Sequence, residues 1–155
     1  MRREEAMQAI SDRIKEMSME TGMFHQAVAD VLGLHITDHK CLDLIHRFGA
    51  MPAGRLAELT GLTTGAVTGV IDRLETAGYV KKAADPKDRR RTIVEPARNK
   101  KLEKKIEMIF IPLHERMHKL LSSYSDAELA LLLDAITKIA GQTREESKRV
   151  EGLQE

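Results

Sequence analysis

The sequence contains little that would serve disulfide formation or the stacking of nucleic-acid bases. Its 155 residues include one cysteine, Cys41, and no tryptophan, and aromatic side chains make up 3% of the chain. A single cysteine cannot form an intrachain disulfide, so the fold does not depend on one. The scarcity of aromatic side chains argues against a surface that stacks on the bases of single-stranded nucleic acid.

The sequence also lacks any apolar run approaching the roughly 18 residues that a membrane-spanning helix needs. Its first residues, MRREEAMQAISDRIKEM, carry acidic groups and have none of the apolar stretch of a signal peptide. We therefore expect a cytoplasmic protein with no membrane partner. Motifs such as a phosphate-cradling glycine loop, a nucleophile elbow or a metalloprotease helix are missing, so we expect neither catalysis nor a cofactor.

The overall composition is typical of one soluble globular domain. Hydrophobic residues make up 42% of the chain and charged residues 32%, which provides enough apolar surface for one core. A length of 155 residues is short for two independent domains. The formal net charge of +1 says little about nucleic acid, because binding depends on where the basic groups lie.

Both ends of the chain have the spacing of apolar residues that is typical of helices. Residues 4–32 predict one long amphipathic helix. Helical spacing returns over residues 100–121, where Pro112 is expected to bend the helix. The segment Ser125–Glu128 has the pattern of a capping box and predicts the start of a last helix. The polar tail past Gly141 is expected either to fray or to extend that helix.

The middle of the chain predicts three shorter helices, the last two joined by a tight turn. Thr37 is the expected N-cap of a helix that ends before Gly49. Pro52 suits the first turn of a short third helix, because proline is tolerated where backbone N–H groups have no helical partner. Thr63 is the expected N-cap of a fourth helix, which Gly78 ends.

After these helices, two short β-prone runs predict a hairpin with a basic tip. The runs are Tyr79-Val80 and Thr92-Ile93-Val94. From Lys81 to Arg91, six basic residues stand against two acidic ones, a net charge of +4. A run of charge is by itself usually a solvated loop. Following two helices joined by a tight turn, however, a basic hairpin completes the order of a winged helix-turn-helix, which binds double-stranded DNA.

A family resemblance lies in the segment LAELTGLTTGAVTGVIDRLETAGYVKKAADPKDRRRTIV, which resembles the core of the multiple antibiotic resistance regulator (MarR) family. It covers residues 37–95 and includes Asp72-Arg73-Leu74, Gly78 and the wing run from Asp85 to Arg90. The flanking helices agree with the family in length and pattern alone. One departure is the stretch from Val94 to Arg98, so the exit from the wing is expected to differ.

The resemblance implies a fold that is mainly α with a small β-hairpin wing, a winged helix-turn-helix with long terminal helices. We expect a single domain over residues 1–155, with the DNA-binding lobe at 35–98 and helical dimerisation regions at 1–34 and 100–155. The implied function is that of a homodimeric transcription regulator, a repressor that binds a pseudo-palindromic duplex operator. The family further implies a small aromatic or phenolic ligand that releases the DNA.

The resemblance makes residues 63–75 the recognition helix and the arginines of the hairpin tip the wing contacts. Small polar residues suit a helix in the major groove, because hydroxyl groups can bond base edges and glycines let the backbone approach closely. The alternative for Gly65 and Gly69 is close packing between helices. Asp72 is implied to support the wing by pairing with Arg89 or Arg90. The candidate DNA-binding residues are Thr63, Thr64, Gly65, Thr68, Gly69 and Arg73 on the helix, with Lys87, Arg89, Arg90 and Arg91 on the wing.

The six histidines raise the question of a metal-responsive regulator. His35 with His39, and His114 with His118, have the spacing of residues on one helical face. Zinc would need a third ligand, for which the candidates are His25, His46, Asp38 and Glu115. Polar groups near an interface account for the same spacing, and we assign no metal site.

Two further alternatives concern Cys41 and the wing. Some members of the family sense peroxide through a cysteine near the start of the chain, whereas Cys41 lies within the second helix. A reactive thiolate needs exposure and a lowered pKa, so we expect Cys41 to be buried and inert rather than redox-responsive. The strongest rival from another class is a winged-helix subunit of a larger assembly, in which the wing grips a protein partner.

Overall fold

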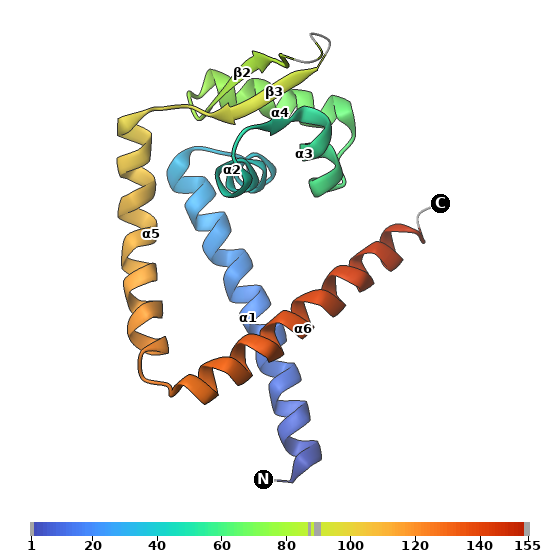
Figure 1. Cartoon of the computed structure of the whole chain (residues 1–155), viewed down its shortest axis with the longest axis vertical. Helices are drawn as coiled ribbons and strands as arrows, with labels where there is room; N and C mark the ends of the chain where they lie inside the picture. The colour runs from blue at the N-terminus through green and yellow to red at the C-terminus, as the bar shows by residue number, and fades with distance from the viewer. Residues whose placement is uncertain (1, 87, 89–90, 154–155) are drawn as a thin grey trace. The chain divides into compact units, whose positions relative to one another are not determined.

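The chain forms a mainly helical fold with one small antiparallel sheet, as the expected fold class requires (Figure 1). The structure, a computed structural model, describes residues 2–86, 88 and 91–153. Its contacts divide the chain into two units, Met1–Glu107 and Met108–Glu155. Within the described residues, none of the helices is long and apolar enough to cross a membrane.

The first unit begins with α1 (Arg3–Leu32) and α2 (Ile36–Phe48), which pack against each other. Gly33 ends α1 with a φ of 70°, a left-handed conformation that glycine adopts without steric cost. The prediction that Thr37 caps α2 is wrong. The N-cap is His35, whose ring nitrogen Nδ1 accepts a hydrogen bond from the backbone N–H of Thr37 at 3.3 Å. A neutral imidazole can do this because one of its nitrogens is an acceptor.

The next two helices are α3 (Ala53–Thr60) and α4 (Thr64–Thr76), joined by a tight turn at Gly61. The predicted cap of α4 is confirmed, because the backbone N–H of Ala66 donates to Thr63 Oγ1 at 3.2 Å. Both helices pack against α2. The turn and the two helices form the expected helix-turn-helix.

A three-stranded antiparallel sheet follows, with strand order β1-β3-β2. The strands are β1 (Met51–Pro52), β2 (Val80–Ala84) and β3 (Thr92–Pro96). The predicted hairpin is confirmed as β2 and β3, which pair Val80 with Pro96 and Ala84 with Thr92. The sequence did not predict β1, whose two residues are too few to show an alternating pattern. β3 also runs two residues beyond the expected Val94.

The core of the first unit lies between the end of α1, the helices α2 to α4 and the sheet. From α4 it takes Val67, Val70, Ile71 and Leu74, the positions that the helical spacing predicted. Tyr79 is also buried, and its hydroxyl donates to the backbone carbonyl of Leu32 at 2.8 Å. The polar end of this side chain is therefore satisfied, as a buried hydroxyl requires.

The second unit contains the later turns of α5 (Lys100–Leu121) and α6 (Asp126–Glu151). Helix α5 continues through Pro112. The predicted capping box is confirmed, because Ser125 Oγ accepts from the N–H of Glu128, and the Glu128 carboxylate accepts from the N–H of Ser125. Past Gly141 the chain extends α6 and does not fray. Neither helix buries a side chain within the described residues.

Candidate nucleic-acid interface

The outer face of α4 begins with small polar residues that are open to solvent. Thr63, Thr64, Gly65 and Thr68 are all exposed, whereas Val67 between them is buried. The Thr68 hydroxyl donates to the backbone carbonyl of Thr64 at 2.9 Å. A Cβ added to Gly65 would meet no atom within 4 Å, so close packing between helices does not explain this glycine. The face presents hydroxyl groups and bare backbone to any ligand that approaches the helix.

Arg73, farther along α4, is bound to an acidic residue of α2. Its Nε donates to Asp38 Oδ2 at 2.8 Å, and its Nη2 donates to Asp38 Oδ1 at 2.6 Å. The Asp38 carboxylate is buried, while the Arg73 side chain remains 58% exposed. The hydrogen bonds that the guanidinium donates to Asp38 raise the pKa of Arg73. The pair joins α2 to the helix that carries the threonines.

Asp72, the residue expected to support the wing, contacts the first strand of the hairpin. Lys82 Nζ of β2 donates to Asp72 Oδ1 at 2.7 Å and lies 2.8 Å from Glu75 Oε2. The backbone N–H of Lys82 also donates to Glu75 Oε1 at 3.1 Å. The hydrogen bonds to Asp72 and Glu75 raise the pKa of Lys82 to about 12. Lys82 therefore stays charged at any physiological pH and links α4 to β2.

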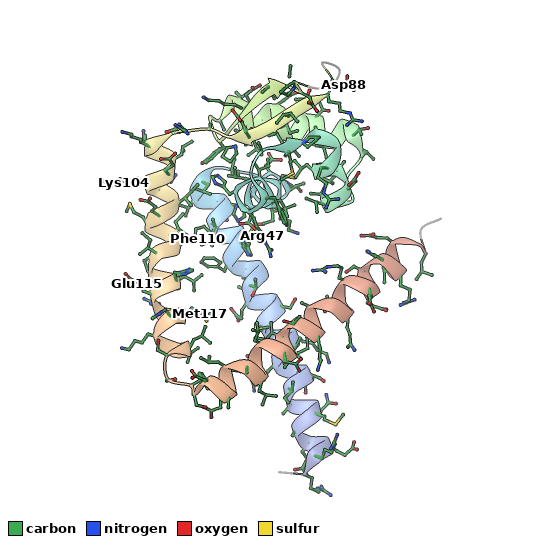
Figure 2. All side chains as sticks on the ribbon, in the orientation of Figure 1. Arg47, Asp88, Lys104, Phe110, Glu115 and Met117 are labelled. Atoms are coloured by element: carbon green, nitrogen blue, oxygen red, sulfur yellow. The ribbon has the colours of Figure 1, made fainter. Side chains whose placement is uncertain are left out.

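The tip of the wing is described in part. Asp88 lies at the tip (Figure 2), and its backbone carbonyl accepts from the N–H of Arg91 at 2.9 Å. The Arg91 side chain is 67% exposed and its Nε lies 3.5 Å from the Asp88 carboxylate. The candidates Lys87, Arg89 and Arg90 lie outside the described residues, and with them the expected pairing of Asp72 with Arg89 or Arg90.

A groove of about 500 Å³ lies between the first turn of α3, the first turns of α4 and the start of β3. Its lining includes two exposed arginines and two of the α4 threonines: Arg55, Arg91, Thr64 and Thr68. The helix and the hairpin expected to contact DNA therefore border one continuous concave surface. Donors on this surface are the kind that bind phosphate and base edges.

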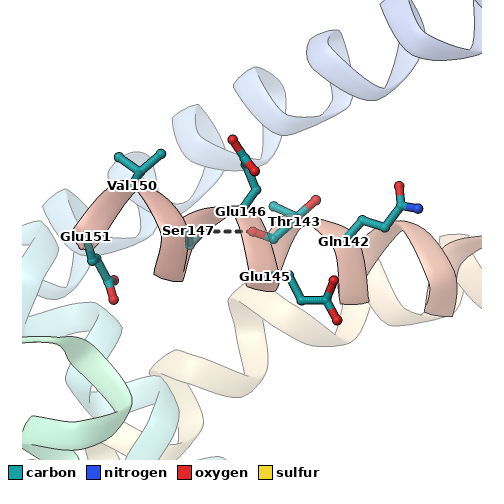
Figure 3. A pocket seen from close by; sticks show the side chains of 7 residues that line it. All are labelled: Gln142, Thr143, Glu145, Glu146, Ser147, Val150 and Glu151. Carbon is teal, nitrogen blue, oxygen red and sulfur yellow. Dashed lines mark hydrogen bonds between the residues drawn. The ribbon is translucent and has the colours of Figure 1, made fainter. Parts of the chain in front are cut away.

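A second hollow, in the other unit, does not resemble a binding site. It runs along one side of α6, from Gln142 to Glu151, and this helix alone lines it (Figure 3). Three of its lining residues are acidic: Glu145, Glu146 and Glu151. Side chains of one helix cannot enclose a small ligand, because a binding pocket usually buries most of the ligand surface.

The structure brings together two histidines that the sequence did not pair. His25 Nδ1 of α1 lies 3.1 Å from His39 Nε2 of α2, and His39 is 4% exposed. Burial, and next the charge of His25, lower the pKa of His39. His35 serves instead as the cap of α2. Among the described residues there is no group of three or more potential ligands that could hold a metal ion.

Cys41 is fully buried, as predicted. Burial, and next the charge of Asp38, raise the pKa of its thiol to about 11. At neutral pH the thiol is therefore protonated, which leaves no thiolate to react with peroxide.

Sequence reasoning missed the roles of Asp38 and Lys82. Asp38 precedes Cys41, Leu42 and Ile45 by three, four and seven residues, so it lies on the apolar stripe of α2. An acidic residue in a buried stripe needs a cationic partner, and this spacing was the available signal. Lys82 gave no such signal, because a lysine in a basic run is ordinarily solvated.

Comparison with known proteins places these features in a family. The model of the MarR family matches residues 34–92. An uncharacterized HTH-type transcriptional regulator, YcgE of Bacillus subtilis strain 168, is 42% identical over 136 residues, which cover 88% of this chain and 87% of that protein. A second regulator of the same organism, YfiV, is 32% identical over 87 residues, 56% of this chain and 51% of that protein.

Solved structures share the fold. A MarR protein from Peptoclostridium difficile matches with a TM-score of 0.64 at 19% identity, over 91% of this chain and 91% of that one. A transcriptional regulator from Thermotoga maritima matches with a TM-score of 0.60 at 24% identity, over 90% of this chain and 96% of that one. The winged-helix architecture expected from the sequence is thereby confirmed.

Proposed function

Because the chain belongs to the MarR family of DNA-binding transcription regulators, which are not enzymes, we propose that it represses transcription by binding a duplex operator as a homodimer. The observation that carries the proposal is the exposed threonine face of α4 beside the basic wing, along one groove. A recognition helix and a wing on the same side of a lobe can contact adjacent grooves of one duplex.

Sequence preference would come from the start of α4. Thr63, Thr64 and Thr68 carry hydroxyl groups that can bond base edges, and Gly65 leaves the backbone free to approach them. Gly69, one turn later, is half-buried, and a Cβ added there would lie 3.4 Å from Arg73 Nη1. The wing would supply binding that depends on salt but not on sequence, because Lys87, Arg89, Arg90 and Arg91 neutralise phosphates or enter the minor groove.

Homodimer formation is supported by apolar side chains that the single chain leaves uncovered. On α6, Leu133 and Ile136 lie three residues apart and expose 69% and 58% of their surfaces. On α1, Ile10 and Met17 expose 58% and 61%. Apolar area left in water on long helices is the usual sign of an interface with another chain. A two-fold dimer would set two recognition helices about 34 Å apart, so the operator would be pseudo-palindromic.

Release of the DNA by a small aromatic or phenolic acid is proposed on the family resemblance alone. Such a ligand would have to favour a dimer geometry in which the two recognition helices miss successive grooves. We name no effector site.

Selecting bound duplexes from a random pool, followed by footprinting, would test the proposal. We expect two inverted half-sites one helical turn apart and a protein dimer at the concentrations used. We also expect Arg90→Ala to weaken binding to all duplexes and to lower the salt slope by roughly one. A monomeric protein, or one without preference for any duplex over bulk competitor at low salt, would contradict the proposal and favour a wing that binds protein.

A further inference from the structure

The contact between Asp38 and Arg73 joins two elements with different tasks. Asp38 lies on the buried side of α2, with 3% of its surface exposed, and Arg73 lies on α4, the proposed recognition helix. Both carboxylate oxygens accept from the guanidinium, at 2.8 and 2.6 Å. A two-point contact of this kind fixes the plane of the guanidinium as well as its position.

The contact uses one edge of the guanidinium and leaves another unoccupied by Asp38. The carboxylate accepts from Nε and Nη2, so Nη1 is not part of the pair. Nη1 lies beside Gly69, where an added Cβ would come to 3.4 Å from it. The Arg73 side chain is also 58% exposed. The buried Asp38 thus holds one edge of the guanidinium, and Nη1 at the other edge lies beside a residue that has no side chain.

The charges around this pair do not divert the arginine. Asp72, the neighbouring acid on α4, lies 2.7 Å from Lys82 Nζ. Of the two carboxylates, Asp38 alone is hydrogen-bonded to Arg73 within the described residues. The orientation of Arg73 is therefore determined by α2 and not by its own helix.

We propose that Asp38 is a positioning residue for DNA recognition, which holds Arg73 so that the free edge of its guanidinium faces the duplex. The inference rests on the proposed function. An unrestrained arginine loses side-chain entropy when it binds, whereas one already held in place loses less. A pre-oriented planar donor also discriminates between sites more strongly than a mobile point charge.

The rival explanation is that the pair simply fastens α2 to α4. Both explanations predict some loss of stability when the pair is broken, so stability alone does not separate them. They differ in what happens once Arg73 has been replaced. A positioning residue then has nothing left to position, whereas a fastening residue would still affect DNA binding through the fold.

The experiment is a double-mutant cycle on the full chain. The variants are Asp38→Asn, Arg73→Gln and the double variant, with Asp43→Asn as the control because it removes an exposed acid from the same helix. Arg73→Lys is added because it keeps the charge and guards against a variant that fails to fold. The probes are a duplex that the unmodified protein selects from a random pool and bulk genomic competitor. Thermal unfolding is recorded for each variant, and DNA binding is measured at a temperature well below the unfolding midpoint of every variant.

We expect Asp38→Asn to lower the ratio of specific to competitor affinity by about tenfold, in the range of one lost bidentate contact. Its affinity for competitor should be unchanged or higher, because an acidic group is removed. In the Arg73→Gln background, adding Asp38→Asn should change the ratio of specific to competitor affinity by less than about twofold. Differences of that size are within the usual scatter of such cycles. Arg73→Lys should lose selectivity while keeping competitor affinity, and Asp43→Asn should match the unmodified protein.

Two results would overturn the inference. Asp38→Asn could leave the ratio unchanged, or it could reduce the ratio equally with and without Arg73. Either result would make the pair a fastening between helices. If the unmodified protein selects no duplex at all, the proposed function itself fails, which is a separate outcome from failure of the cycle.

Discussion

The two units of this chain differ in what covers their apolar side chains. In the first unit, Leu74 of α4 is fully buried among residues of the same chain. In the second, Leu133 of α6 exposes 69% of its surface. The two side chains have the same chemistry, so burial alone decides what each contributes. The apolar side chains of α4 are covered within one chain, whereas α6, and in the first unit the early part of α1, have apolar faces that require another surface to cover them.

The largest effect that would test this difference is expected at Leu74. Leu74→Ala should lower the free energy of unfolding by about 2–5 kcal/mol, because it removes buried contacts and leaves a cavity. Chemical denaturation, followed by a spectroscopic signal from the tertiary structure of the first unit, measures this loss of free energy. Leu133→Ala is the matched variant, and at protein concentrations where the chain is monomeric it should change that free energy by less than about 0.5 kcal/mol. Equal losses of unfolding free energy in Leu74→Ala and Leu133→Ala would show that the two leucines are covered to the same extent in the monomer.

A smaller effect is expected on self-association. Leu133→Glu places a charge on an apolar face and should raise the dimer dissociation constant by at least about tenfold, the effect of one interface residue worth over 1 kcal/mol. Analytical ultracentrifugation over a concentration series measures it. Gln142→Glu introduces the same carboxylate on the opposite side of α6 and is expected to leave association unchanged. If Leu133→Glu and Gln142→Glu both associate as the unmodified protein does, α6 is not part of the interface.

The smallest effect is expected from pH, at the contact between His25 and His39. Burial lowers the pKa of His39 below its ordinary value of 6.5, so folding favours the neutral ring. This contribution to stability is complete above pH 6.5 and is lost as the pH falls below that value. With His25 Nδ1 at 3.1 Å, one of the two facing nitrogens must lack a hydrogen. The exposed Asp43 opposes the shift and so reduces its size.

We therefore expect the thermal midpoint to fall more between pH 7.5 and pH 5.5 in the unmodified protein than in His39→Gln. Other ionisable groups of the protein also contribute to the pH dependence, and the comparison with His39→Gln subtracts their contribution. Asp43→Asn should enlarge the fall slightly, because it removes the charge that favours protonated His39. If His39→Gln loses as much stability on acidification as the unmodified protein, the histidine pair does not sense pH.

The parts of the fold predicted from the sequence are those determined by neighbours along the chain. The stripe Val67, Val70, Ile71 and Leu74 identified the buried face of α4, and Thr63 identified its start. Both signals are local, because helical periodicity and capping act over a few residues. The hairpin was predicted for the same reason, from two β-prone runs on either side of a polar turn.

The parts that were not predicted depend on pairs distant in sequence. Met51 and Pro52 form a strand because Val94 and Ile93 lie opposite them, and nothing within β1 indicates this. Asp38 meets Arg73 across 35 positions, and His25 meets His39 across 14. The candidate surface on α4 was predicted from the helical spacing and from the family resemblance. The contacts of Asp38 and Lys82, which join α4 to α2 and β2, became visible in the structure.

The hydrogen bond from the Tyr79 hydroxyl to the carbonyl of Leu32 has a mechanical consequence. Leu32 is the last residue of α1, and Tyr79 immediately precedes β2. The hydrogen bond therefore attaches the end of this 30-residue helix to the start of the hairpin. Lys105 Nζ donates a hydrogen bond to the backbone carbonyl of Val31, the residue before Leu32, at 2.5 Å. As long as these hydrogen bonds are intact, a rotation of α1 about its N-terminal end also moves the hairpin. Helix α1 therefore acts as a lever that can change the position of the wing.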